Sequence, residues 1–205
     1  MSEKCCSVIS SSTDNPRLKR ILWFVFILNF GMFFLELTLG YLYKSTALMA
    51  DSLDMLSDAF VYGVSILVLM RCGHVKAKVS LIKGVVMTVM ALYVAYELFS
   101  RTLNPTEPDG QIIASIGILA LVVNAICFWL LSKYKEGDIN LRSAWICSRN
   151  DMLANLGVIA AGLLVLYSGN QWPDFVIGAV IAALVLISSF RVMTDSMKEL
   201  KQPNN

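Results

Sequence analysis

Six long apolar runs dominate this 205-residue sequence and constrain its fold more than any other feature. A helix needs roughly 20 apolar residues to cross a hydrocarbon layer about 30 Å thick. The sequence therefore predicts an all-α membrane protein of six transmembrane helices, and only Lys44-Ser45 separates the first two, which should form a tight hairpin. The predicted spans are 21–43, 46–70, 79–100, 111–131, 143–167 and 174–194.

Composition supports lipid as the main solvent of this chain. Hydrophobic residues make up 57% of it and charged residues only 16%, whereas soluble domains carry about 25% charged residues. The first apolar run is too long for a signal-peptide core, so we expect it to be retained as a span. No basic stretch is interleaved with aromatic residues, which argues against a nucleic-acid ligand.

The distribution of Lys and Arg predicts the orientation. Fourteen of the 17 basic residues fall on the side that holds both termini, two fall on the other side, and Arg149 lies within a span. Because basic loops stay in the cytoplasm, both termini should be cytoplasmic. The lean loops suit a bacterial inner (plasma) membrane. We expect a flexible cytoplasmic tail at 1–16, a six-helix transmembrane domain at 17–198 and a short cytoplasmic tail at 199–205.

The second span carries acids where lipid should exclude them. Asp51, Asp54 and Asp58 lie within about two helical turns, and the span holds no Lys or Arg that could neutralise them. Each Asp near the centre of a bilayer costs about 2.5–3.5 kcal/mol on insertion scales. Such residues should therefore face the interior of the bundle, where they have a partner or a function.

Spacing pairs two of these acids with two residues of the fifth span. Asp54 and Asp58 are four residues apart, so they lie on one helix face about 6 Å from each other. Cys147 and Asp151 repeat that spacing in the fifth span. Two neighbouring helices that each offer two anionic ligands can close a four-coordinate site, the geometry that Zn²⁺ prefers. The spacing thus predicts a divalent-metal site built from these four residues.

Each candidate ligand has a structural alternative. Asp54 and Asp58 could instead hydrogen-bond to a neighbouring helix, and Cys147 could be a small buried hydrophobic residue. Asp51, nearer the outer end of its span, is either a ligand or a residue of the helix cap or of a vestibule. Glu36 in the first span is a further candidate for that vestibule.

Other polar residues of the fifth span have more local roles. Arg149 points away from the candidate ligands, and we expect it to pair with Glu36 or Glu97 or to extend to the cytoplasmic surface. Asn150 and Asn155 could support the metal ligands, but ordinary hydrogen bonds between helices are favoured.

Cysteine and histidine outside the spans give weaker signals. The five cysteines are odd in number, so no disulfide framework is indicated. Cys72 and His74 share a predicted cytoplasmic loop, where a peripheral metal contact competes with a simple solvated loop. Cys5 and Cys6 in the N-terminal tail could capture a thiophilic metal, yet an isolated pair of cysteines is a weak indicator.

Three stretches resemble a known family. Residues 36–58, which end in STALMADSLDMLSD, resemble the second-span signature of the cation diffusion facilitator family. The NLGV that follows Asp151 and the WPD at 172–174 are similar to its fifth and sixth spans. The resemblance covers roughly residues 17–198.

This resemblance implies a six-span, usually homodimeric carrier that exports divalent transition metals in exchange for protons. It places the transport site on Asp54, Asp58, Cys147 and Asp151. The family commonly has His at the position of Cys147, and a thiolate shifts preference toward softer ions such as Zn²⁺ and Cd²⁺. Typical members continue into a cytoplasmic domain, so we expect a short member without it, whose dimer would form through transmembrane helices.

The resulting prediction is a secondary transporter without a cofactor. It would export Zn²⁺ or Cd²⁺, with Co²⁺ or Fe²⁺ as further candidates, by proton antiport across the lipid bilayer. The alternatives are a non-transporting membrane subunit that binds or hands over metal, and a passive metal channel. We do not expect an enzyme, because the sequence contains no zinc-protease H-E-x-x-H, nucleophile elbow, P-loop or dinucleotide fingerprint.

Overall fold

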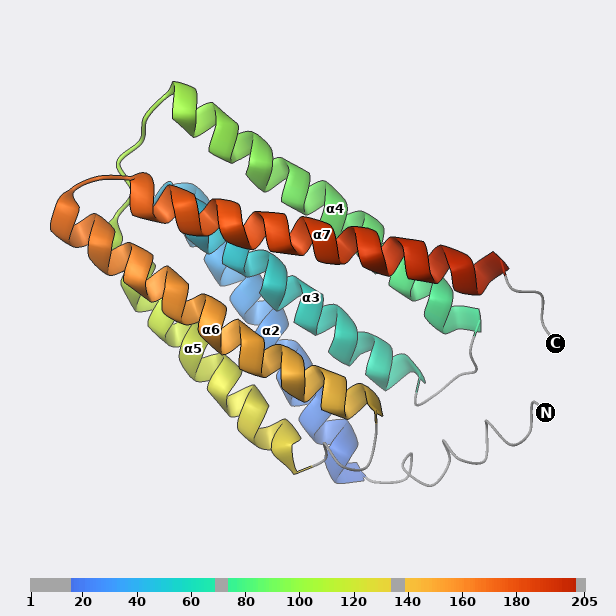
Figure 1. Cartoon of the computed structure of the whole chain (residues 1–205). Coiled ribbons are helices and arrows are strands. Elements are labelled where there is room, and N and C mark those ends of the chain that lie inside the picture. The colour runs from blue at the N-terminus through green and yellow to red at the C-terminus, as the bar shows by residue number, and fades with distance from the viewer. Residues whose placement is uncertain (1–15, 69–73, 134–138, 202–205) are drawn as a thin grey trace, which may run out of the picture.

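The computed structural model describes residues 16–68, 74–133 and 139–201, and every regular element in these ranges is an α-helix. Side chains are described there except at 64–65, 67–68, 74–80, 139–144, 146–147 and 199–201. The predicted six-helix architecture is confirmed, and each predicted span overlaps one helix over most of its length. The helices are α2 (Pro16–Leu42), α3 (Thr46–Val68), α4 (His74–Leu103), α5 (Gly110–Ser132), α6 (Ile139–Ser168) and α7 (Trp172–Lys201) (Figure 1).

Five of the described helices are long and apolar enough to cross a membrane. The exception is α3, which has 23 residues but carries the three acids. The chain is therefore a multi-pass integral membrane protein. The N-terminus of α2 and the C-terminus of α7 lie at the same end of the bundle (Figure 1). The cytoplasmic location of this end stays a prediction.

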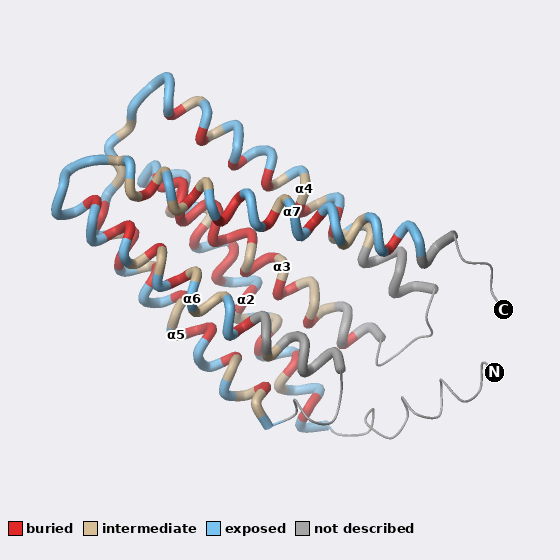
Figure 2. Tube along the Cα trace, in the orientation of Figure 1, coloured by how far each residue is buried: buried red, intermediate tan, exposed pale blue. Residues whose placement is uncertain are grey.

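The acid-bearing helix α3 lies at the centre of the bundle. It packs against each of the other five described helices, and no other helix in the described ranges does so. The outward faces of the surrounding helices are exposed while α3 is mostly buried (Figure 2). Large apolar side chains such as Trp23, Phe99 and Leu153 lie on those outward faces, as expected of a surface in contact with lipid.

The turn between α2 and α3 is as tight as predicted. Lys44 adopts a left-handed conformation with φ of 55°, which reverses the chain two residues after the end of α2 at Leu42. Ser45 follows at once and caps α3, because its Oγ accepts a hydrogen bond from the Leu48 amide at 3.1 Å. The two helices therefore lie side by side as a hairpin.

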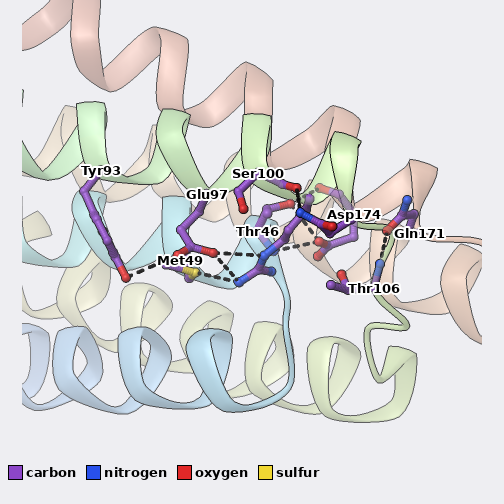
Figure 3. Close-up of polar contacts among 10 residues, drawn as sticks. Thr46, Met49, Tyr93, Glu97, Ser100, Thr106, Gln171 and Asp174 are labelled. Atoms are coloured by element: carbon purple, nitrogen blue, oxygen red, sulfur yellow. Dashed lines mark hydrogen bonds and ion pairs between the residues drawn. The ribbon is translucent and has the colours of Figure 1, made fainter.

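Asp174 at the start of α7 holds the first turn of α3 (Figure 3). Its carboxylate accepts hydrogen bonds from Ser45 Oγ at 2.5 Å, the Thr46 amide at 2.7 Å, Thr46 Oγ1 at 2.8 Å and the Ala47 amide at 3.2 Å. The first amides of a helix have no partner within it, so this acid satisfies two of them and complements the helix dipole. Gly178 permits the close approach, since a Cβ there would lie 2.7 Å from the Thr46 carbonyl carbon. We call Ser45, Thr46, Ala47 and Asp174 the α3 clasp.

An ion pair within α4 contacts α3 through Met49. Arg101 Nη2 is 3.2 Å from Glu97 Oε2 and 3.4 Å from Met49 Sδ, and Figure 3 shows Glu97 and Met49 close together. Arg149, by contrast, is exposed, and its guanidinium lies 6.0 Å from the centre of the Trp145 ring. The expected pairing of Arg149 with Glu97 is wrong, because an arginine one turn away on the same helix holds that carboxylate.

Candidate metal centre

The three acids of α3 face different neighbours. Asp58 lies against α6, Asp54 lines a cavity toward α4 and α7, and Asp51 lies near the acid of α2. Asp51 and Asp58 are buried and Asp54 is partly buried. Because α3 is surrounded by helices, these side chains are in contact with protein rather than lipid, as the sequence predicted.

Asp58 and Asp151 form a carboxyl pair that joins α3 to α6. Their carboxyl groups lie within hydrogen-bonding reach of each other. Two carboxyl groups can share a hydrogen bond only when one of them carries a proton. Tyr62 supports the pair, because its hydroxyl donates to Asp58 Oδ2 at 3.2 Å and lies 3.1 Å from Ser148 Oγ. We call Asp58 and Asp151 the central carboxyl pair.

Asp54 borders a small cavity of about 40 Å³ between α3, α4 and α7. A polar cavity of this size can hold water. Lys83 of α4 reaches this cavity and is close enough to Asp54 and Asp58 to interact with them electrostatically. The sequence does not single out this cation, although a lysine inside the third predicted span is a signal of it. The polar lining residues besides Asp54 are Ser57, Lys83, Ser188 and Ser189.

Three candidate metal ligands cannot be placed. Cys147 belongs to α6 one turn before Asp151, but its side chain lies outside the described residues. The same holds for Cys72 and for the side chain of His74. Among the described side chains, no three His, Cys, Asp or Glu residues lie close enough together to hold a metal ion. The set of four ligands therefore stays a prediction.

The residues assigned to a vestibule or a supporting role separate into two groups. Glu36, Asp51 and Asn155 are buried, and Asn150 is exposed. The interhelical hydrogen bonds expected of Asn155 are absent from the described part of the chain, since neither of its amide atoms has a partner. Asp51 does not cap α3, because Ser45 occupies that position. The expected pairing of Glu36 with Arg149 is also wrong, because Arg149 is exposed and both carboxyl oxygens of Glu36 lack a partner.

A second thiol lies beside the central carboxyl pair and was missed by sequence analysis. Cys127 of α5 is fully buried, and its Sγ accepts a hydrogen bond from Asn29 Nδ2 at 3.5 Å. It is close enough to Asp58 and Asp151 to interact with them electrostatically. The sequence signal was an amide in the first span and a cysteine in the fourth, both isolated within apolar runs.

Comparison with known families identifies a match over most of the chain. Residues 22–201 match the family described as the cation efflux transmembrane domain. This range contains all six helices except the first turns of α2. It also contains every residue of the predicted four-ligand set.

Several curated proteins are similar to the chain. The cadmium, cobalt and zinc/H(+)-K(+) antiporter of Bacillus subtilis is 29% identical over 198 residues, which cover 90% of this chain and 64% of the relative. The zinc transporter ZitB of Escherichia coli is 30% identical over 207 residues, covering 93% and 65%. The metal cation efflux system protein CzcD of Cupriavidus metallidurans is 23% identical, covering 80% and 56%. The chain thus spans less than two thirds of the length of each of these relatives.

Proposed function

The chain belongs to the cation efflux transmembrane domain family, and from that premise we propose that it carries divalent transition-metal cations out of the cytoplasm in exchange for protons. The observation that supports this most directly is the central carboxyl pair. Asp58 and Asp151 come from two different helices, lie inside the bundle and are within hydrogen-bonding reach of each other. A bound cation would neutralise the negative charge of two such adjacent carboxylates.

Exchange of a proton for a metal ion follows from the chemistry of the pair. A buried carboxyl pair avoids two adjacent negative charges by keeping a proton between its oxygens. A divalent cation can replace that proton, because it neutralises both carboxylates at once. Metal binding therefore releases a proton, and protonation of the pair on the other side of the membrane releases the metal. This reciprocal competition is what proton antiport requires.

Two further ligands would complete the coordination. Asp54 lies one turn from Asp58 on α3, and Cys147 lies one turn from Asp151 on α6. Together the four would supply three carboxylates and a thiolate to a tetrahedral Zn²⁺ or Cd²⁺. Because Asp54 borders the Lys83 cavity, we propose that its side chain turns from Lys83 toward the metal when the ion binds.

The relatives support the class of cargo. Their names give zinc for ZitB, and cadmium, cobalt and zinc for the Bacillus subtilis antiporter. We therefore propose Zn²⁺ and Cd²⁺ as the first substrates, with Co²⁺ next. A homodimer held by the transmembrane helices stays a prediction.

Transport by proteoliposomes that contain only this chain tests the proposal. A zinc-sensitive dye inside the vesicles should report Zn²⁺ entry that accelerates when an imposed pH gradient drives protons outward. D58N and D151N should each abolish this uptake. D109N is the matched control, because Asp109 is exposed, caps α5 and can be replaced by another capping residue.

Three results would contradict the proposal. Uptake in D58N or D151N at the rate of the unchanged protein would remove the central carboxyl pair from the pathway. Uptake that ignores the pH gradient would indicate a passive channel. An inactive but well-folded chain that still binds Zn²⁺ would indicate a subunit that hands metal to a partner.

A further inference from the structure

Glu36 on α2 and Asp51 on α3 are buried acids for which the fold supplies no adequate partner. Glu36 is 0% exposed and Asp51 is 1% exposed. Neither carboxyl oxygen of Glu36 has a hydrogen-bond partner in the described structure, and Asp51 Oδ2 has none either. The buried acid Asp174 shows the usual solution, because its carboxylate accepts four hydrogen bonds from the start of α3. The fold thus satisfies Asp174 but leaves Glu36 and Asp51 without adequate partners.

The two unsatisfied acids are neighbours. Glu36 is close enough to Asp51 to interact with it electrostatically. The α2–α3 hairpin explains this, because its close contact between Gly40 and Met49 brings the preceding turn of α2 level with the following turn of α3. Neither acid forms an ion pair with any residue in the described ranges. Two buried carboxylates without a counter-ion are strongly unfavourable, so their charge must be neutralised by a bound cation or by protons.

Asn155 supplies a third, independent group that points to a ligand. Ser148 and Asp151 both contact α3, through Tyr62 and Asp58, so this face of α6 is directed at α3. Asn155 lies on the same face one turn further along. It is 0% exposed, and neither its Oδ1 nor its Nδ2 has a partner among the described residues. The two helices α3 and α6 run in opposite directions (Figure 1). Because Asp151 lies against Asp58, Asn155 is about 6 Å further toward the Lys44 end of the bundle, level with Asp54 and about 4.5 Å along the helix axis from Asp51.

We propose that Glu36, Asp51 and Asn155 form a second cation site, distinct from the central carboxyl pair. Its donors are two carboxylates and an amide carbonyl, all oxygen atoms, which suit hard and borderline divalent cations such as Mn²⁺ and Zn²⁺. Because it lacks sulfur, this site binds Zn²⁺ in preference to the softer Cd²⁺. We call it the outer site.

The outer site lies on the path toward the Lys44 end of the bundle. Asp51 is three residues from Asp54 and seven from Asp58, which is about 4.5 Å and about 10 Å along α3. A cation that leaves the central carboxyl pair in that direction meets the outer site next. A role of the outer site in the release of transported metal depends on the proposed transport function, whereas the binding of a second ion does not.

Counting bound ions tests the outer site. Equilibrium dialysis of the purified full chain in detergent micelles against Zn²⁺ should give two ions per chain for the unchanged protein. E36Q/D51N should lose the outer ion and bind one, and D58N/D151N should also bind one. The matched control is E107Q/D109N, which removes two exposed carboxylates near the same end of the bundle and should still bind two.

The amide variants preserve side-chain shape, and the unfolding midpoint of the metal-free protein should not fall. If the double variant is not monodisperse, the single variants E36Q and D51N should each raise the Kd for the second Zn²⁺ at least about tenfold.

Two ions in E36Q/D51N, or a single ion in the unchanged protein, would overturn the outer site. Loss of both ions in E36Q/D51N would overturn it as well, because the acids would then only support the central pair. Two ions in D58N/D151N would count against the proposed transport site, while a single ion in E36Q/D51N would still support the outer site.

Discussion

Replacing Asp174 with alanine tests whether α7 holds the first turn of α3. The side chain accepts four hydrogen bonds, two from backbone amides and two from hydroxyl groups. The hydroxyl groups of Ser45 and Thr46 can rotate toward other acceptors, but the amides of Thr46 and Ala47 cannot. A buried amide left without a partner costs about 1–3 kcal/mol, so D174A should lower the free energy of unfolding by roughly 2–6 kcal/mol.

The measurement is equilibrium unfolding of the purified protein in mixed micelles, followed by the loss of helical circular dichroism. D174N should lose about half as much stability, since its single carbonyl oxygen can still accept from one amide. D195A is the control, because Asp195 is exposed and its ion pair with Lys198 spans 3.5 Å, so its removal should change stability by less than about 1 kcal/mol. A D174A protein within 1 kcal/mol of the unchanged protein would refute the clasp as a source of stability.

Two further predictions concern packing and the support of the central carboxyl pair. G162A should destabilise the α5–α6 contact by about 1–3 kcal/mol in the same unfolding assay, because its Cβ would lie 2.5 Å from the Ala114 amide. G31A, whose Cβ would meet nothing within 4 Å, should leave stability unchanged or higher, and equal effects of the two changes would contradict the packing argument. Y62F removes the hydroxyl that donates to Asp58 and should weaken Zn²⁺ binding in dialysis about 10–100-fold with the helix content unchanged. Unaltered Zn²⁺ affinity in Y62F would show that this hydrogen bond does not orient the carboxylate.

The helices could be predicted because each depends on local composition. The apolar runs set their lengths, and the break at Lys44 and Ser45 fixed the first hairpin. The proximity of Asp58 and Asp151 could also be predicted, since the spacing of one turn between polar residues on each of two spans restricts which helix faces can meet. These features follow from periodicity along the chain, which a single sequence displays.

Contacts between distant helices were less accessible. The sequence left three options for Arg149, namely a pair with Glu36, a pair with Glu97 or extension to the cytoplasmic surface. No rule of spacing ranks it against Arg101, which lies one turn from Glu97. The hydrogen bonds expected of Asn155 depended on which groups of neighbouring helices lie within hydrogen-bonding distance of it, and among the described residues none does. The approach of Lys83 to Asp54 depends on how α4 packs against α3, which the sequence does not encode locally. Side-chain partners across helices therefore required the structure.

The α3 clasp fixes one end of the central helix and thereby decides how the helix can move. A rod pinned at one end swings most at the other, so a tilt of α3 about Thr46 acts as a lever. Asp58 lies twelve residues, or about 18 Å, from that pivot, and a 10° tilt would shift it by about 3 Å. Asp51, about 7.5 Å from the pivot, would move only about 1.3 Å. A single small swing would thus part Asp58 from Asp151 while Asp51 stays beside Glu36, and spin labels near the two ends of α3 should show this unequal displacement.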